Sequence, residues 1–197
     1  MTRITFIRHG NTYWNNEKRA QGYSQNPLSE TGFKQAHLVA DRLVNDQFDV
    51  FICSDLKRAM QTADIISEKI EMPIDFYDER IREIGRGKIT GTIESERIEK
   101  WGENWRDLDL GEETKEELRK RGLDFVEDIV ERYPNQHILV VTHGLLLGQV
   151  LKGLLKDEET GRKLINCSVT TVEKTGDSWQ CDVYNCTKHF DGADLGI

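Results

Sequence analysis

Three short apolar runs, each ending directly in polar residues, constrain the fold of this chain most strongly. They occupy residues 4–7 (ITFI), 50–53 (VFIC) and 138–141 (ILVV), and β-branched side chains are frequent in them. Continuous apolar runs of this length are typical of strands that are buried on both faces, as in a parallel sheet covered by helices. Each run is followed by polar residues and then by helical periodicity, which predicts alternating strands and helices.

The segments between and after these runs complete an α/β pattern. Ser29 is a favoured N-cap, and the helix after it places Phe33 and Val44 on one apolar stripe with alanines and Leu43. The last helix is almost wholly apolar and is expected to be buried. We predict helices over residues 29–45, 56–69, 113–133 and 144–155, and an antiparallel strand pair over 168–175 and 179–186. The predicted fold is a three-layer α/β/α sandwich with a mostly parallel sheet.

The chain is predicted to form a single domain over residues 1–197, because no linker-like segment or internal repeat divides it. Residues 84–112 are the least regular part. They carry Trp101 and Trp105 at i,i+4 spacing among charged residues, a pattern that more often packs a small helix than lines a substrate site. This helical excursion between two sheet elements is a candidate partial lid.

Composition excludes several classes of function. The formal charge is −8, from 27 Lys and Arg against 35 Asp and Glu, and no basic stripe is present, which argues against a nucleic-acid partner. No segment approaches the roughly 20 apolar residues of a membrane span, and the first apolar run is too short for a signal peptide. Four cysteines without a CxxC pair favour reduced thiols and a cytoplasmic location. No cluster has metal-ligand spacing, and no exposed apolar stripe indicates an oligomeric state.

The chemistry-bearing residues follow the carboxyl ends of the three apolar runs. Ligands of open α/β sheets bind beyond the carboxyl ends of the strands. We therefore expect one site to contain Arg8, His9, Arg58 and His143. Two arginines and two histidines at such close range require an anion, and phosphate fits arginine forks and helix N-termini. One histidine after a strand would be unremarkable, but the strand, His-Gly, helix pattern occurs twice and favours a site.

These residues lie in an ordered set of motifs that resembles the histidine phosphatases, the phosphoglycerate mutase-like family with an RHG signature. The first block is Arg8-His9-Gly10-Asn11-Thr12 with Trp14-Asn15, and Gln21-Gly22 follows it. The later blocks are Ser54-Asp55-Leu56-Lys57-Arg58-Ala59 and Val141-Thr142-His143-Gly144, and Asn166 with Ser168-Val169-Thr170 extends the match almost to the C-terminus. RHG alone is a weak signal, whereas the complete ordered set is specific.

The resemblance implies a mechanism and assigns roles to matching positions. His9 would attack phosphorus and form a phosphohistidine, and Glu83 would protonate the leaving group. From the residues alone, Glu83 beside Arg82 would be interpreted as a surface charge. The remaining implied roles are phosphoryl binding by Arg8, Arg58 and His143, and contacts to phosphate or substrate by Asn15, Thr12, Gln21, Gly22 and Gly144. No cofactor and no metal are implied, and the expected partner is a small phosphorylated substrate.

Three departures from the family pattern bear on the substrate. Arg86 and Lys88 come after Glu83 where the family has aromatic and acidic residues, which hints at a substrate with a second anionic group; solvated surface charges are an equal interpretation. Gly148 stands in place of a frequent arginine, and Asn11 replaces a commoner Glu or Gln.

Three functions remain open at the level of sequence. The first is a phosphatase that acts on a small phosphomonoester. The second is a phosphoglycerate mutase, which uses the same residues but returns the phosphate to its substrate; at 197 residues the chain is too short for the segment that closes the site in mutases, which favours hydrolysis. The third is a non-catalytic phospho-ligand binder, which would need neither nucleophile nor acid.

Overall fold

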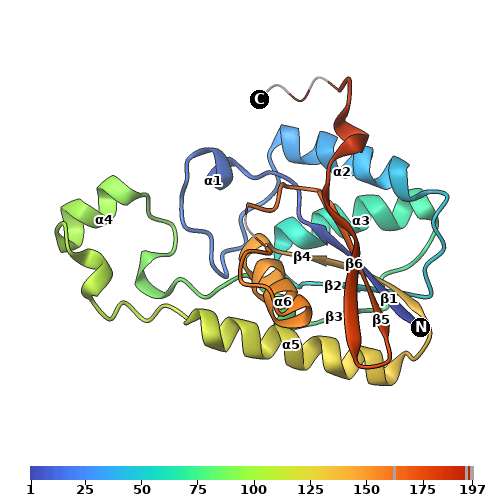
Figure 1. Cartoon of the computed structure of the whole chain (residues 1–197). Coiled ribbons are helices and arrows are strands. Elements are labelled where there is room, and N and C mark those ends of the chain that lie inside the picture. Colours follow the sequence, from blue (N-terminus) through green and yellow to red (C-terminus); the bar gives the residue numbers. More distant parts are fainter. Residues whose placement is uncertain (162, 194, 196–197) are drawn as a thin grey trace.

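The computed structural model describes residues 1–161, 163–193 and 195. Its centre is a six-stranded sheet with the order β3-β2-β4-β1-β5-β6 (Figure 1). The strands β1, β2, β3 and β4 are parallel, whereas β5 runs antiparallel to both β1 and β6. The bounds are β1 Thr2–Arg8, β2 Val50–Cys53, β3 Phe76–Tyr77, β4 His137–Thr142, β5 Val169–Thr175 and β6 Ser178–Cys186.

Two helices cover each face of the sheet, and Figure 1 shows the resulting three layers. The helices α2 (Glu30–Leu43) and α3 (Lys57–Ile70) pack on one face, and α5 (Lys115–Arg132) and α6 (Gly144–Leu155) pack on the other. Successive strand residues alternate between the two cores: Phe6 belongs to the α5–α6 side and Ile7 to the α2–α3 side. The predicted three-layer sandwich is therefore confirmed, because strands buried on both faces need helices on both faces.

The predicted elements are present with ends shifted by a few residues, and the antiparallel pair over β5 and β6 is confirmed. Ser29 is the N-cap of α2 and its hydroxyl accepts from the Gly32 amide at 3.1 Å. The burial expected for Phe33 and Val44 is wrong, since they are 38% and 45% exposed. Both lie roughly a quarter-turn or more from the centre of the buried stripe, so the packing of α2 leaves them at its edge.

Residues 84–112, the candidate lid that we call the lid segment, form a small unit beside the sheet. It has 3₁₀ turns at Gly87–Ile89 and Trp105–Asp107 and the helix α4 (Glu94–Trp101). Figure 1 shows α4 projecting beyond the body of the molecule, with the short helix α1 (Tyr13–Asn16) between them. Ile89, Trp105 and Leu110 form a separate apolar cluster, against which Trp101 packs. The packing role expected for the two tryptophans is confirmed.

All four cysteines are free thiols, and Cys53 and Cys167 are fully buried. Across residues 1–161, 163–193 and 195, no helix combines the length and the apolar character needed to cross a membrane. The same residues contain no group of three or more His, Cys, Asp or Glu side chains that could hold a metal ion.

Candidate active site

The pairing of β1 with β4 brings two histidines together. Arg8 is opposite Thr142 in the parallel register, so the next residues, His9 and His143, leave the same edge of the sheet side by side. Their ring centroids are 5.1 Å apart. Arg58 lies in the first turn of α3, and its Nε donates to His9 Nε2 at 3.3 Å.

His9 is held as a neutral imidazole with a defined tautomer. Its side chain is buried, and Nδ1 lies 2.7 Å from the Gly10 carbonyl oxygen, which can only accept. The proton is therefore on Nδ1, and Nε2 carries the lone pair. Burial lowers the pKa of His9 well below its ordinary value, and the positive charges of Arg58 and Arg8 lower it further. The Asn166 amide donates to the His9 carbonyl oxygen at 2.9 Å and fixes the backbone.

Arg58 is completely buried and is tied to the chain segment that follows α1. Its Nη2 donates to the Gly22 carbonyl oxygen and its Nη1 to the Ser24 carbonyl oxygen, both at 3.0 Å. Burial lowers the pKa of Arg58 to about 10, so the guanidinium stays charged near neutral pH. A fixed positive charge consequently lies against the lone pair of His9.

Arg8 is anchored from the other side of the site. Its Nη1 donates to the Leu164 carbonyl oxygen. Its Nε is buried and has no hydrogen-bond partner in the part of the chain that the structure describes. A Cβ atom at position 144 would lie 3.0 Å from this Nε, so a side chain at the start of α6 would force the guanidinium to shift by a few tenths of an ångström. Gly144 thus acts by close approach to Arg8.

His143 is the N-cap residue of α6 and is also fully buried. Its Nε2 lies 2.8 Å from the Ser54 hydroxyl, and its Nδ1 has no partner among the described residues. Burial lowers its pKa well below the ordinary value, with Arg58 and His9 acting in the same direction. A neutral ring that accepts from Ser54 carries its proton on Nδ1, where it can serve as a donor.

Glu83 lies at the N-terminus of α6. Its carboxylate accepts hydrogen bonds from its neighbour Ile84 (3.0 Å) and from the amides of Leu145 and Leu146 (3.2 Å each). Free amides and the helix dipole both favour an acidic group at this position. The structure therefore brings Glu83 to the same cavity as His9 from a distant part of the sequence.

The site opens into a cavity of about 590 Å³ whose walls are predominantly basic. Residues of the lid segment form one side of it, and the loop before β5 forms another. The charged lining residues are Arg8, Lys18, Arg19, Arg58, Glu83, Arg86, Arg97, Arg106, Glu112 and Lys163. In a chain of net charge −8, this local excess of positive charge favours an anionic ligand.

Most of the residues predicted to contact phosphate or substrate line this cavity, whereas Thr12 and the fully buried His143 do not. Asn15, Gln21 and Gly22 are lining residues. Thr12 is wholly buried outside the lining, and its hydroxyl accepts from the Asn15 amide at 3.1 Å as the N-cap of α1. The expected phosphate contact of Thr12 is thus not supported, because the short helix uses its hydroxyl. Lys88 is exposed and also lies outside the lining, whereas Arg86 is within it and pairs with Glu112 at 2.9 Å.

The sequence did not indicate several residues of the site. Arg97 and Arg106 lie against the Trp105 ring at 5.0 and 4.5 Å from its centroid, and all three line the cavity. They belong to a segment without a recognisable motif, and Lys163 comes from an irregular loop. The matched motifs did contain Ser54 and Asn166, but only the structure shows which histidine each contacts.

Two neutral histidines, the buried Arg58 and the half-buried Arg8 lie together at the carboxyl edge of a parallel sheet, an arrangement whose positive charge favours an anionic ligand. Comparison with known families agrees. The model of the histidine phosphatase superfamily (branch 1) matches residues 4–187, and the chain belongs to this superfamily.

Curated relatives cover nearly the whole chain. The uncharacterized phosphatase PhoE of Bacillus subtilis is 30% identical over 194 residues, covering 98% of both chains. A metal-independent phosphoserine phosphatase of Arabidopsis thaliana is 32% identical, covering 96% of this chain and 84% of its own. A probable phosphoglycerate mutase, GpmB of Yersinia pestis, is 34% identical, with 91% and 88% covered. Both classes of enzyme considered from the sequence therefore occur among the relatives.

Solved structures confirm the fold. Bacillus stearothermophilus YhfR superposes with a TM-score of 0.85 at 29% identity, covering 96% of this chain and 99% of that one. A phosphoserine phosphatase from Entamoeba histolytica, in complex with 3-phosphoglyceric acid, has a TM-score of 0.81 at 28% identity, with 96% and 99% covered. Proteins of this fold thus bind small phosphorylated ligands.

Proposed function

We propose that this chain is a phosphatase that hydrolyses a small phosphomonoester through a phosphohistidine on His9. The observation that carries the proposal is the neutral imidazole of His9, with its proton fixed on Nδ1 by the Gly10 carbonyl and its Nε2 lone pair beside Arg58. Nucleophilic attack requires such an unprotonated nitrogen. The phosphoryl oxygens would be bound by Arg8, Arg58 and His143, whose positive charge or N–H groups offset the charge of the transferring group.

The reaction balances in two steps. In the first, Glu83 enters as the carboxylic acid; Nε2 of His9 forms a bond to phosphorus while the ester P–O bond breaks, and the leaving oxygen takes the Glu83 proton. In the second, the Glu83 carboxylate accepts a proton from water, the hydroxyl oxygen bonds to phosphorus, and the P–N bond breaks. Inorganic phosphate leaves, and both side chains return to their starting states. Because arginines balance the charge, no step requires a cofactor.

The substrate proposed is a small molecule with a phosphate and a second anionic group. The basic walls of the cavity support this, as do the relatives and neighbours whose names specify phosphoserine and 3-phosphoglyceric acid. Lys18 and Lys163 lie at the cavity as exposed cations, whereas Arg86 is ion-paired with Glu112.

The test is a metal-free assay in EDTA between pH 5 and 8, with p-nitrophenyl phosphate and 3-phosphoglycerate as substrates. We expect phosphate release by the wild type and by a His37→Ala control, since His37 is exposed on α2, and none by His9→Ala. A ³²P-labelled substrate should leave a base-stable, acid-labile label on the wild type alone. Formation of 2-phosphoglycerate with little phosphate release would instead establish a mutase. Phosphate binding without any turnover would establish a binding protein.

A further inference from the structure

Arg121 of α5 binds the backbone on either side of Glu83. Its Nη1 donates to the carbonyl oxygens of Arg80 and Arg82 at 2.6 and 2.8 Å, and its Nη2 donates to that of Glu83 at 2.9 Å. One guanidinium therefore fixes the path of the chain that presents the Glu83 carboxyl group. This segment has only one 3₁₀ turn, Glu79–Ile81, so few other backbone hydrogen bonds hold it.

Glu113 completes this arrangement from the end of the lid segment. Its carboxylate accepts from Arg121 Nε and Nη2 at 2.6 and 2.9 Å, and from the Gly85 amide at 2.8 Å. The Glu113 amide in turn donates to the Gly85 carbonyl oxygen at 2.9 Å. Burial opposes ionisation of Glu113, but the hydrogen bonds from Arg121 and Gly85 outweigh it, and its pKa lies below the usual value. The two ends of the lid segment are thereby joined next to Glu83.

We propose that Arg121, oriented by Glu113, is a positioning residue that holds Glu83 in place to protonate the leaving group. The proposal rests on the role of Glu83 in the proposed function. Neither residue lines the cavity, so neither would touch the substrate, and both would act through the backbone of Glu83 and Gly85. The charge of Arg121 also helps to lower the pKa of His143, and a lysine at position 121 would keep that charge. Proton transfer is sensitive to shifts of a fraction of an ångström in the position of the donor. The rate of this transfer therefore depends on how firmly the backbone of Glu83 is held.

A guanidinium is required for this task because of its geometry. Arg121 contacts three carbonyl oxygens and one carboxylate, and its planar fork presents five N–H donors in fixed directions. A lysine ammonium at the same position keeps the charge but cannot reach all four acceptors at once. The ion pair is also mostly buried, with 19% of the Arg121 and 14% of the Glu113 side chain exposed, which favours a single geometry.

The test separates positioning of the acid from general loss of structure by changing the leaving group. 2,4-Dinitrophenolate is stable without a proton, whereas an alkoxide such as that of glycerol phosphate is not, so only the second substrate depends on the acid. Because Glu83 also takes a proton from water in the second step, the comparison uses kcat/KM, which reports only the steps up to loss of the leaving group. For Arg121→Met we expect kcat/KM on glycerol phosphate to fall about 30-fold or more, and kcat/KM on 2,4-dinitrophenyl phosphate to change less than about threefold. The affinity for inorganic phosphate should change little, because the phosphate-binding groups are untouched.

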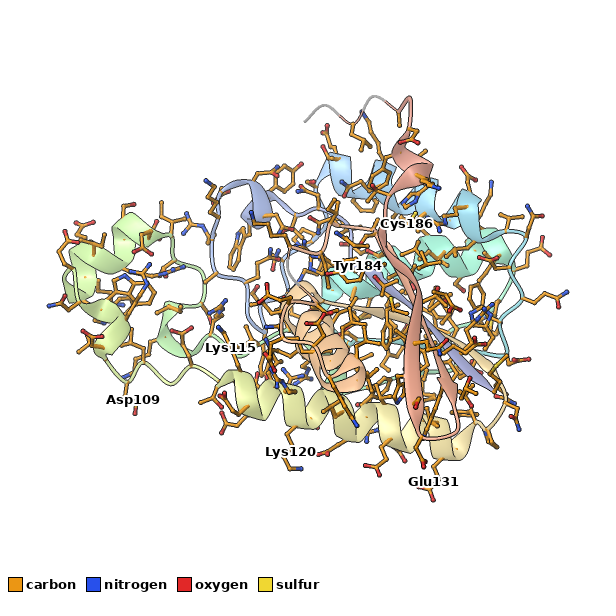
Figure 2. All side chains as sticks on the ribbon, viewed as in Figure 1. Asp109, Lys115, Lys120, Glu131, Tyr184 and Cys186 are labelled. Atoms are coloured by element: carbon orange, nitrogen blue, oxygen red, sulfur yellow. The ribbon has the colours of Figure 1, made fainter. Side chains whose placement is uncertain are left out.

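Three further variants make the experiment decisive. Lys120→Met is the matched control, since Lys120 is its neighbour on α5, is 76% exposed and points away from the body in Figure 2; it should match the wild type on both substrates. Arg121→Lys should show the same selective loss to a smaller extent, and it decides the question if Arg121→Met does not fold. Glu83→Gln removes the acid itself and shows how activity on each of the two substrates responds to that loss.

The outcomes distinguish this proposal from the function on which it rests. Equal losses on both substrates in a folded Arg121 variant, or no loss on either, would overturn the positioning role. Glu83 would still be supported as the acid if Glu83→Gln loses activity on glycerol phosphate alone. If Glu83→Gln itself shows no dependence on the leaving group, the acid assignment is wrong and the role of Arg121 is refuted with it.

Discussion

His9 and His143 face each other with ring centroids 5.1 Å apart and ring planes tilted by 56°, at the ends of two paired strands. Both rings are fully buried, and burial lowers both pKa values well below 6.5, with Arg58 adding to the effect at each ring. Two imidazolium ions could not lie this close to two arginines. Both histidines are therefore neutral in the native protein, and this can be measured through the pH dependence of stability.

The first prediction concerns the pH dependence of stability. As the pH falls through 6.5, His9 and His143 take up protons in the unfolded chain but not in the native protein, so the free energy of unfolding falls. The loss is at most about 1.4 kcal/mol per pH unit for each histidine, and it is absent above pH 7. Urea unfolding at pH 8, 6.5 and 5 measures it. His9→Gln should flatten the slope, and an unchanged slope in this variant would contradict the burial argument.

Gly144→Ala should damage the site without unfolding the protein. The new Cβ would meet Arg8 Nε at 3.0 Å and Cζ at 3.3 Å, so the guanidinium must move. We expect kcat/KM to fall roughly 10- to 100-fold, as for other small displacements of a binding group. Steady-state kinetics and thermal unfolding measure the two effects.

Gly122→Ala is the matched contrast for Gly144→Ala. Its Cβ would lie 2.5 Å from Val150 Cγ2, between α5 and α6 and away from the cavity. We expect a loss of about 1–3 kcal/mol in the free energy of unfolding from overpacking, with kcat/KM unchanged. If both glycine variants had the same effect on kcat/KM, the close approach to Arg8 would not explain the loss of activity in Gly144→Ala.

Anion binding can be tested without turnover. Inorganic phosphate or orthovanadate at about 100 times its Kd should stabilise the native state by about 2.7 kcal/mol, which raises Tm by roughly 5–10 °C in a domain of this size. Arg8→Met should lose most of the shift, because it removes a guanidinium that lines the cavity next to His9. Arg3→Met changes an exposed arginine at the other end of β1, and this variant should keep the full rise in Tm on addition of the anion. Equal shifts in the two variants would place the anion elsewhere.

The lid segment should respond locally to the loss of its core. Trp105 is 5% exposed, and its ring contacts both Arg97 and Arg106. In Trp105→Ala we expect faster proteolysis within residues 84–112 and a KM about tenfold higher, equivalent to about 1.4 kcal/mol, at an almost unchanged Tm. Leu108→Ala, in the same segment but 48% exposed, should behave as the wild type. A large fall in Tm would show that the segment is part of the main folding unit.

The local pattern of the sequence determined the sheet and the first part of the site. Apolar runs that end in Arg8-His9-Gly10 and Thr142-His143-Gly144 predict parallel strands, and parallel strands bring the residues after them to one edge of the sheet. The convergence of Arg8, His9 and His143 could therefore be predicted from the strand pattern alone. The short β3 was not predicted, because two residues are too few for a periodic signal.

Only the tertiary structure decided the parts of the site that depend on packing between distant segments. Glu83 reaches the site because the N-terminal amides of α6 bind it as a cap, and Arg121 holds its backbone from another helix. Thr12 adjoins the signature in sequence, yet its hydroxyl turns to cap α1. Hydrogen bonds of this kind depend on where each side chain finds a donor or acceptor, and residue order does not specify that position. The sequence thus determined the strands and the edge of the sheet at which the candidate site lies, and packing determined which neighbours complete the site.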